Sequence, residues 1–153
     1  MDFNLDKVFK GSDQQQVDIF LNSYYSFLFL KKNSFYDFLK ANSDANSPAI
    51  RLLISCKDSD QYDSIVDFFK PFRNVQAKNV QTSAEPAEHM ITIITNQNEV
   101  SFFKIDYNTD KRMFICKLSD SLTGDIVTFF YVLFVNIWST IDKNIILEKR
   151  NIF

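Results

Sequence analysis

Apolar positions near the N-terminus of the chain recur with a helical spacing. Residues 12–15, SDQQ, have the form of a capping box, in which the Ser hydroxyl and a Gln side chain bind main-chain amides at a helix start. The next apolar residues form one stripe at the i, i+3, i+4 and i+7 positions: Val17, Phe20, Leu21, Tyr24 and Leu28. We therefore expect a helix to begin near residue 12. Residues 34–37 should bend or restart it before a loop at 41–48.

The pattern then changes to alternation. Residues 49–56, AIRLLISC, alternate apolar and other side chains and predict a strand buried mainly on one face. Asp58, Ser59 and Asp60 follow as candidate caps of a short helix that Pro71 ends. The apolar stripe of that helix consists of Tyr62, Ile65, Val66 and Phe69. Residues 74–81 predict a polar strand at a sheet edge, and residues 82–89 predict a mobile loop.

Three segments in the second half are rich in β-branched and aromatic residues and are separated by short polar turns. They are residues 90–95, 99–107 and 112–118. This arrangement predicts an antiparallel meander.

The last long apolar stretch, residues 126–141, carries no charged residue. As a helix it is shorter than the ~30 Å that a membrane crossing needs, so we expect a buried helix. On a helical wheel one side should face the core: Ile126, Phe130, Leu133, Phe134, Ile137 and Ile141. Tyr131, Val135 and Trp138 fall away from that side.

These elements and the length of 153 residues predict one α+β domain over residues 1–153. We expect an antiparallel sheet of about four or five strands, packed against N- and C-terminal helices.

Charge and cysteine content narrow the classes of partner and compartment. A formal net charge of -2, with scattered Lys and Arg residues, argues against nucleic acid as a partner. The first residues include acids and lack the apolar core of a secretory signal, so we expect a cytoplasmic protein. Cys56 and Cys116 lie in apolar, strand-like segments and predict two buried thiols.

Candidate catalytic chemistry is sparse. His89 is the sole histidine, and catalysis through it would need Cys56 or Cys116 as a nucleophile in an exposed, electropositive setting. We expect it to be an ordinary loop histidine. The acids Asp58, Asp60 and Asp63 could bind Mg²⁺ after a strand, but capping the following helix explains them better.

Metal and nucleotide cofactors are not expected. Two distant cysteines and one histidine cannot supply four close zinc ligands. With 2 glycines in the chain, neither a phosphate-binding loop nor a dinucleotide fingerprint can be assembled. The sequence therefore predicts no cofactor and no metal site.

A surplus of apolar helix surface is the remaining functional signal. The residues that we expect to point away from the core, and that could bind a partner, are Ile19, Phe29, Leu30, Tyr131, Val135 and Trp138. Alternatively, the first and last helices cover each other or lie under the C-terminal tail. We predict a non-catalytic, cytoplasmic protein-binding module, such as an immunity protein, an antitoxin or a secretion chaperone. Its alternatives are a small metal-dependent hydrolase or nuclease that uses the acids at 58–63, and a structural homo-oligomer or subunit of a larger assembly.

Overall fold

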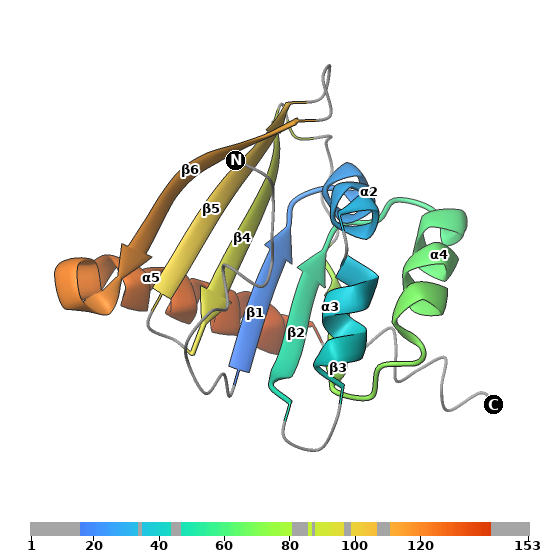
Figure 1. Cartoon of the computed structure of the whole chain (residues 1–153), viewed down its shortest axis with the longest axis horizontal. Helices are drawn as coiled ribbons and strands as arrows, with labels where there is room; N and C mark the ends of the chain where they lie inside the picture. Colours follow the sequence, from blue (N-terminus) through green and yellow to red (C-terminus); the bar gives the residue numbers. More distant parts are fainter. Residues whose placement is uncertain are drawn as a thin grey trace.

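The chain folds around one mixed sheet with helices on both faces (Figure 1). The computed structural model describes residues 16–33, 35–43, 47–80, 86, 88–96, 99–106 and 111–141, with the main chain alone described at 106 and 111–124. Six strands lie in the order β3-β2-β1-β4-β5-β6. The strands are β1 (Gln16–Leu21), β2 (Ala49–Ile54), β3 (Val75–Asn79), β4 (His89–Thr95), β5 (Glu99–Asp106) and β6 (Lys111–Ser119). The helices are α2 (Tyr24–Lys32), α3 (Phe35–Ala41), α4 (Ser59–Phe69) and α5 (Asp120–Thr140).

The first described element is a strand, so the prediction of a helix through residues 17–21 is wrong. Val17, Ile19 and Leu21 are fully buried, which is the period-2 pattern of a strand. Val17, Phe20 and Leu21 also fit a helical spacing, and the predicted stripe continued through Tyr24 and Leu28, which belong to α2. β1 pairs with β2 on one side and with β4 on the other, so it lies inside the sheet. The predicted capping box at residues 12–15 lies outside the described residues.

The sheet is mixed, and our prediction of an antiparallel sheet of four or five strands is wrong, although the α+β class holds. β1, β2 and β3 are parallel. The helices α2 and α3 connect β1 to β2, and α4 connects β2 to β3. Such crossovers return the chain to the end of the sheet where the previous strand began, so that the next strand runs parallel to it. β4, β5 and β6 pair antiparallel with their neighbours, so the predicted meander is confirmed.

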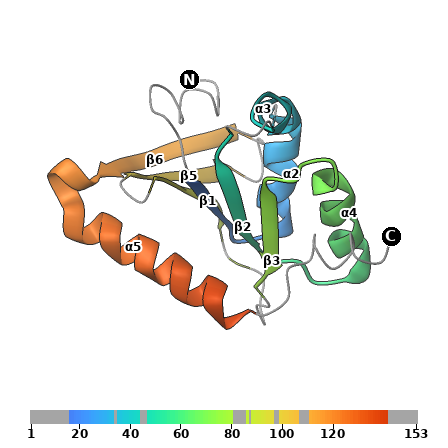
Figure 2. The ribbon, with the colours of Figure 1, turned by 90° about the horizontal axis from the view of Figure 1, so that it is seen from below.

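Two apolar cores lie on opposite faces of the sheet. Side chains alternate along β2, where Ile50, Leu52 and Ile54 join the core beneath α2, α3 and α4, and Leu53 joins the core beneath α5. Figure 2 shows α5 on the side of the sheet opposite α2, α3 and α4. The first core is the larger of the two and contains many Phe rings in contact with one another; Phe69, for example, meets Phe27 at a tilt and Phe35 edge-on.

Several local predictions for the middle of the chain are confirmed, although β2 is buried on both faces and not mainly on one. A helix restarts at Phe35 as α3, and β3 lies at the sheet edge. Asp58 is the N-cap of α4, where its carboxylate accepts a hydrogen bond from the Gln61 amide. Within the described residues, α5 included, no helix has the length and apolar character that crossing a membrane requires.

Candidate functional site

Helix α5 presents an apolar surface on the side that faces away from the sheet. Its buried residues are Val127 and Phe134, the latter 4% exposed. Exposed large apolar side chains occupy the opposite side: Ile126, Phe129, Val132 and Leu133. We call these four residues the α5 face. Phe129 is 62% exposed and Leu133 43%, so the helix leaves much of its apolar surface in solvent.

The predicted orientation of α5 is therefore wrong in part. Ile126 and Leu133 were expected in the core but are exposed. Tyr131 and Trp138 were expected to point outward, but both are partly buried and pack against the core beneath α5. Val135 is also partly buried. Phe130, Phe134, Ile137 and Ile141 do contact that core, as predicted.

An ion pair on the sheet explains why Trp138 turns inward. Asp18 is 1% exposed and accepts hydrogen bonds from Arg51, at 2.7 Å from Nε and 3.1 Å from Nη2. The Arg51 guanidinium lies 5.4 Å from the Phe134 ring centroid and 5.6 Å from that of Trp138. Lys78 lies 4.5 Å from the Trp138 ring and donates a hydrogen bond of 2.8 Å to the Trp138 carbonyl oxygen. Cations on the sheet thus attract the aromatic side of α5.

The electrostatics of this cluster favour a permanently charged Arg51. Burial lowers the pKa of Arg51, but hydrogen bonds and charge from Asp18, and then from Tyr131, raise it, and the net pKa is raised. Gln16 supports the same carboxylate, with its amide nitrogen 2.8 Å from one Asp18 oxygen. The cluster of Gln16, Asp18 and Arg51 therefore holds its charges in fixed positions beneath α5.

The other predicted partner-binding residues lie inside the protein. Ile19 and Leu30 are fully buried, and Phe29 is almost so. All three belong to the core between the sheet and α2, α3 and α4. The prediction that they point outward is wrong, because residue 19 lies on a central strand and α2 packs against the sheet and against α4, where Phe27 contacts Phe69. They cannot contact a partner in this fold.

A serine and the histidine meet where β1 ends and β4 begins. Ser23 Oγ lies 2.6 Å from His89 Nδ1. Both side chains are buried, and His89 lies in β4 rather than in the loop that we predicted. Ser23 Oγ also accepts a hydrogen bond from the Ser26 amide as the N-cap of α2. Because Ser23 is buried and already serves as a cap, this pair holds α2 against β4 and does not resemble an accessible nucleophile and base.

The remaining titratable candidates are the two cysteines and the acidic residues. Burial, together with the charge of Asp58, raises the pKa of the Cys56 thiol to about 11, which disfavours the reactive thiolate. The side chain of Cys116 lies outside the described residues. Among the described side chains, no group of three or more His, Cys, Asp or Glu residues is placed to hold a metal ion.

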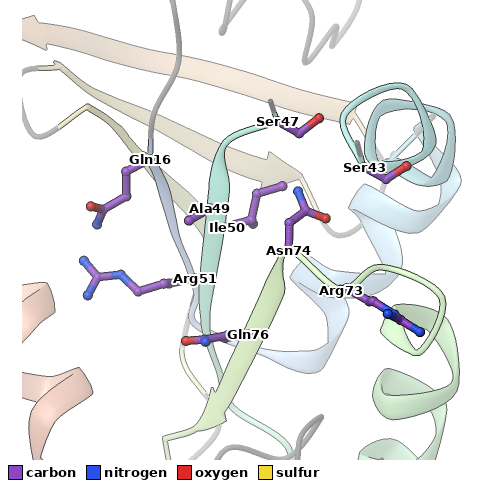
Figure 3. A pocket seen from close by; sticks show the side chains of 9 residues that line it. All are labelled: Gln16, Ser43, Ser47, Ala49, Ile50, Arg51, Arg73, Asn74 and Gln76. Carbon is purple, nitrogen blue, oxygen red and sulfur yellow. The ribbon is translucent and has the colours of Figure 1, made fainter. Parts of the chain in front are cut away.

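A pocket of about 580 Å³ opens at the end of the sheet where β2 and β3 begin. Its lining includes two arginines, Arg51 and Arg73 (Figure 3). They do not converge on one point, because Arg51 extends toward Gln16 and Arg73 extends away from it. Asn74, between them, donates to the carbonyl oxygens of Asn42 and Pro48. The pocket therefore lacks the convergent polar groups that orient a small ligand.

The α5 face is consequently the feature of the described chain that most resembles a functional surface. Sequence reasoning pointed to this helix, but the three of its residues that it placed outward, Tyr131, Val135 and Trp138, are partly buried. Comparisons with protein-family models, with curated proteins and with solved structures find no match for this chain.

Proposed function

We propose that this protein is a non-catalytic association module that binds another polypeptide chain through the α5 face. One observation carries the proposal, namely that Ile126, Phe129, Val132 and Leu133 are all exposed on one helix. A contiguous apolar patch costs free energy in water, and on soluble proteins such patches mark interaction sites. The partner that suits this surface presents an apolar face of its own, most simply that of a helix.

The packing beneath α5 supports a binding role. A surface that binds a partner has to keep its shape, and α5 is fastened to the sheet by Arg51 and Lys78 as well as by its apolar side. A rigid, pre-formed helix face loses little conformational entropy when a partner binds. The α5 face therefore suits a preformed docking surface.

The proposed module is non-catalytic because the candidate catalytic groups have structural roles or unsuitable surroundings. Ser23 serves as a helix cap, Asp58 caps α4, and burial keeps Cys56 in the thiol form. A cytoplasmic location is part of the same proposal, since a buried free thiol such as Cys56 is typical of a reducing compartment. Immunity proteins, antitoxins and secretion chaperones are the classes that we propose, because each acts by covering another polypeptide.

Site-specific photo-crosslinking in cells tests the proposal. Phe129 is replaced with benzoylphenylalanine, and Tyr36, which is 45% exposed on α3, receives the same replacement as the control. We expect adducts with a second polypeptide chain from position 129 and not from position 36. Adding Leu133→Asp should abolish them. If positions 129 and 36 give the same adducts, or none, the α5 face is not a binding surface.

A further inference from the structure

Helix α5 has two apolar sides that overlap. The side that packs on the sheet consists of Val127, Phe130, Tyr131, Phe134, Ile137, Trp138 and Ile141. The side that the helical wheel favours shares four of these residues, but has Ile126 and Leu133 in place of Val127, Tyr131 and Trp138. At about 100° per residue, a rotation of roughly 50° about the helix axis converts one side into the other. Both sides are apolar, so burial of apolar surface alone does not fix the rotation of α5.

We propose that Arg51 and Lys78 are positioning residues that hold α5 in the rotation that exposes the α5 face. The inference rests on the proposed function, because it names the residues that set the same binding surface. Arg51 belongs to β2 and Lys78 to β3, so neither side chain is part of the α5 face. Each cation acts through the aromatic residues of α5 that it contacts, and this contact turns the opposite side of the helix into solvent.

Arg51 favours the observed rotation through two side chains of α5. Its guanidinium lies 5.6 Å from the Trp138 ring centroid, and it donates a hydrogen bond to the Tyr131 hydroxyl. A rotation of roughly 50° would carry both side chains away from the guanidinium. Tyr and Trp have a polar group that needs a partner when it is buried. Contact with Arg51 therefore favours the burial of Tyr131 and Trp138 over that of Ile126 and Leu133.

Lys78 fixes the last turn of α5 through one residue. Its ammonium group lies 4.5 Å from the Trp138 ring centroid and donates a hydrogen bond of 2.8 Å to the Trp138 carbonyl oxygen. A cation at the C-terminal end of a helix also interacts favourably with the helix dipole. Because Lys78 contacts both the ring and the main chain of Trp138, it holds this side of the helix toward the sheet. Losing a partly desolvated cation–π contact should shift the balance between the two rotations by about 10-fold, the factor for ~1.4 kcal/mol.

The other rotation would change the surface that α5 presents. It would bury Ile126 and Leu133, which are 48% and 43% exposed, and it would bring Tyr131 and Trp138 to the surface. Val132 would stay exposed, because it lies nearly opposite the sheet in both rotations. The α5 face would thus lose two of its four residues, although the sequence of the helix would be unchanged.

A triple variant that leaves α5 unchanged and removes both cations tests the positioning. It combines Arg51→Met and Lys78→Gln with Asp18→Leu, so that no buried carboxylate loses its partner. The chain has 1 Trp, and in the triple variant we expect it to emit at longer wavelength and to be quenched more strongly by acrylamide. Lys78→Gln alone should give a smaller change in the same direction. The matched control is Lys78→Arg, which keeps a cation at the site and should behave like the parent. Far-UV circular dichroism confirms that each variant is folded.

Thiol labelling distinguishes a rotation of α5 from its detachment. Leu133→Cys should react with a maleimide about 10-fold more slowly in the triple variant than in the parent background, because rotation buries position 133 and a buried thiol reacts only when the structure opens locally. Val132→Cys should react at the same rate in both backgrounds. The native cysteines are the same in all these proteins, so the comparison is matched. An exposed Trp138 with an unchanged rate at position 133 would mean that α5 detaches, and this result would overturn the inference.

The outcomes separate this inference from the proposed function. If Trp138 and position 133 behave in the triple variant as in the parent, the cations do not set the rotation and the inference is wrong. Adducts from position 129 of the parent would still support the association module. If the parent gives no such adducts, the proposed function is wrong, while quenching and labelling still decide whether the cations set the rotation. If both proposals hold, the triple variant should give fewer adducts at position 129 than the parent, and Lys78→Arg should give as many.

Discussion

Replacing Arg51 with Met removes the cation that neutralises a buried carboxylate. Asp18 is 1% exposed and receives two hydrogen bonds from Arg51, so after the change the neutral amide of Gln16 is the hydrogen-bond donor that its carboxylate keeps among the described residues. Leaving one member of a buried ion pair without its partner costs about 3–5 kcal/mol. The cation–π contacts of Arg51 with Phe134 and Trp138 are lost in addition. We therefore expect the free energy of unfolding of Arg51→Met to fall by about 3–5 kcal/mol.

Urea denaturation monitored by tryptophan fluorescence measures this loss well. The chain has 1 Trp, and Trp138 lies at the cluster itself, so its emission reports the unfolding of α5 from the sheet. The matched control is the double variant Asp18→Leu with Arg51→Met, which removes both charges and restores an apolar contact. It should remain within about 2 kcal/mol of the parent, because replacing both members of a buried pair is often neutral.

Two results would refute this reasoning. A loss below about 1 kcal/mol for Arg51→Met would mean that Asp18 is not buried as a charged group, since an unpaired buried carboxylate costs more than that. A double variant as unstable as the single one would mean that Arg51 acts through its packing against α5 and not through its charge.

Three further predictions concern single side chains. Phe134→Ala should lower the free energy of unfolding by about 3–5 kcal/mol, because Phe134 is buried. Leu133→Ala, measured on the monomer at low concentration, should lower it by less than about 1 kcal/mol, because Leu133 is exposed. Equal losses would mean that α5 is rotated. Ser23→Ala should lower the free energy of unfolding, measured by chemical denaturation, by about 1–2 kcal/mol. The change removes the N-cap of α2 and the hydrogen bond between Ser23 and His89. A gain in stability would contradict this role. Because burial raises the pKa of Cys56 from 9.0 to about 11, the folded chain keeps a proton that the unfolded chain releases, and stability should fall as pH rises from 9 to 11. Cys56→Ala should lack that part of the decline, and parallel stability curves for parent and variant would refute it.

The sequence by itself determined the elements whose patterns are local. Asp58 caps α4 because its carboxylate reaches an amide three residues away, and no distant contact is needed. The three strands of the meander are joined by short turns, so adjacent segments in the sequence become neighbours in the sheet. The polar strand β3 could be placed at an edge because one side of an edge strand faces water.

The tertiary structure decided the state of residues 17–21, whose apolar positions fit two periods. Val17 and Leu21 are four residues apart, which suits a helix, and with Ile19 they also alternate as in a strand. Pairing with both β2 and β4 satisfies the hydrogen-bonding groups of the main chain in this segment, and this selects the strand. Those partners lie about 30 and 75 residues further along the chain, so a local pattern cannot reveal them.

The tertiary structure also decided which side of α5 became the candidate site. A helix that is apolar on nearly every side has no preferred core face of its own, so the wheel could not choose between Leu133 and Trp138. The choice depends on the sheet beneath, where Arg51 and Lys78 attract the Trp138 ring. Turning that ring inward leaves Phe129 and Leu133 in solvent. The interacting residues come from β2, β3 and α5, and only the fold brings them together.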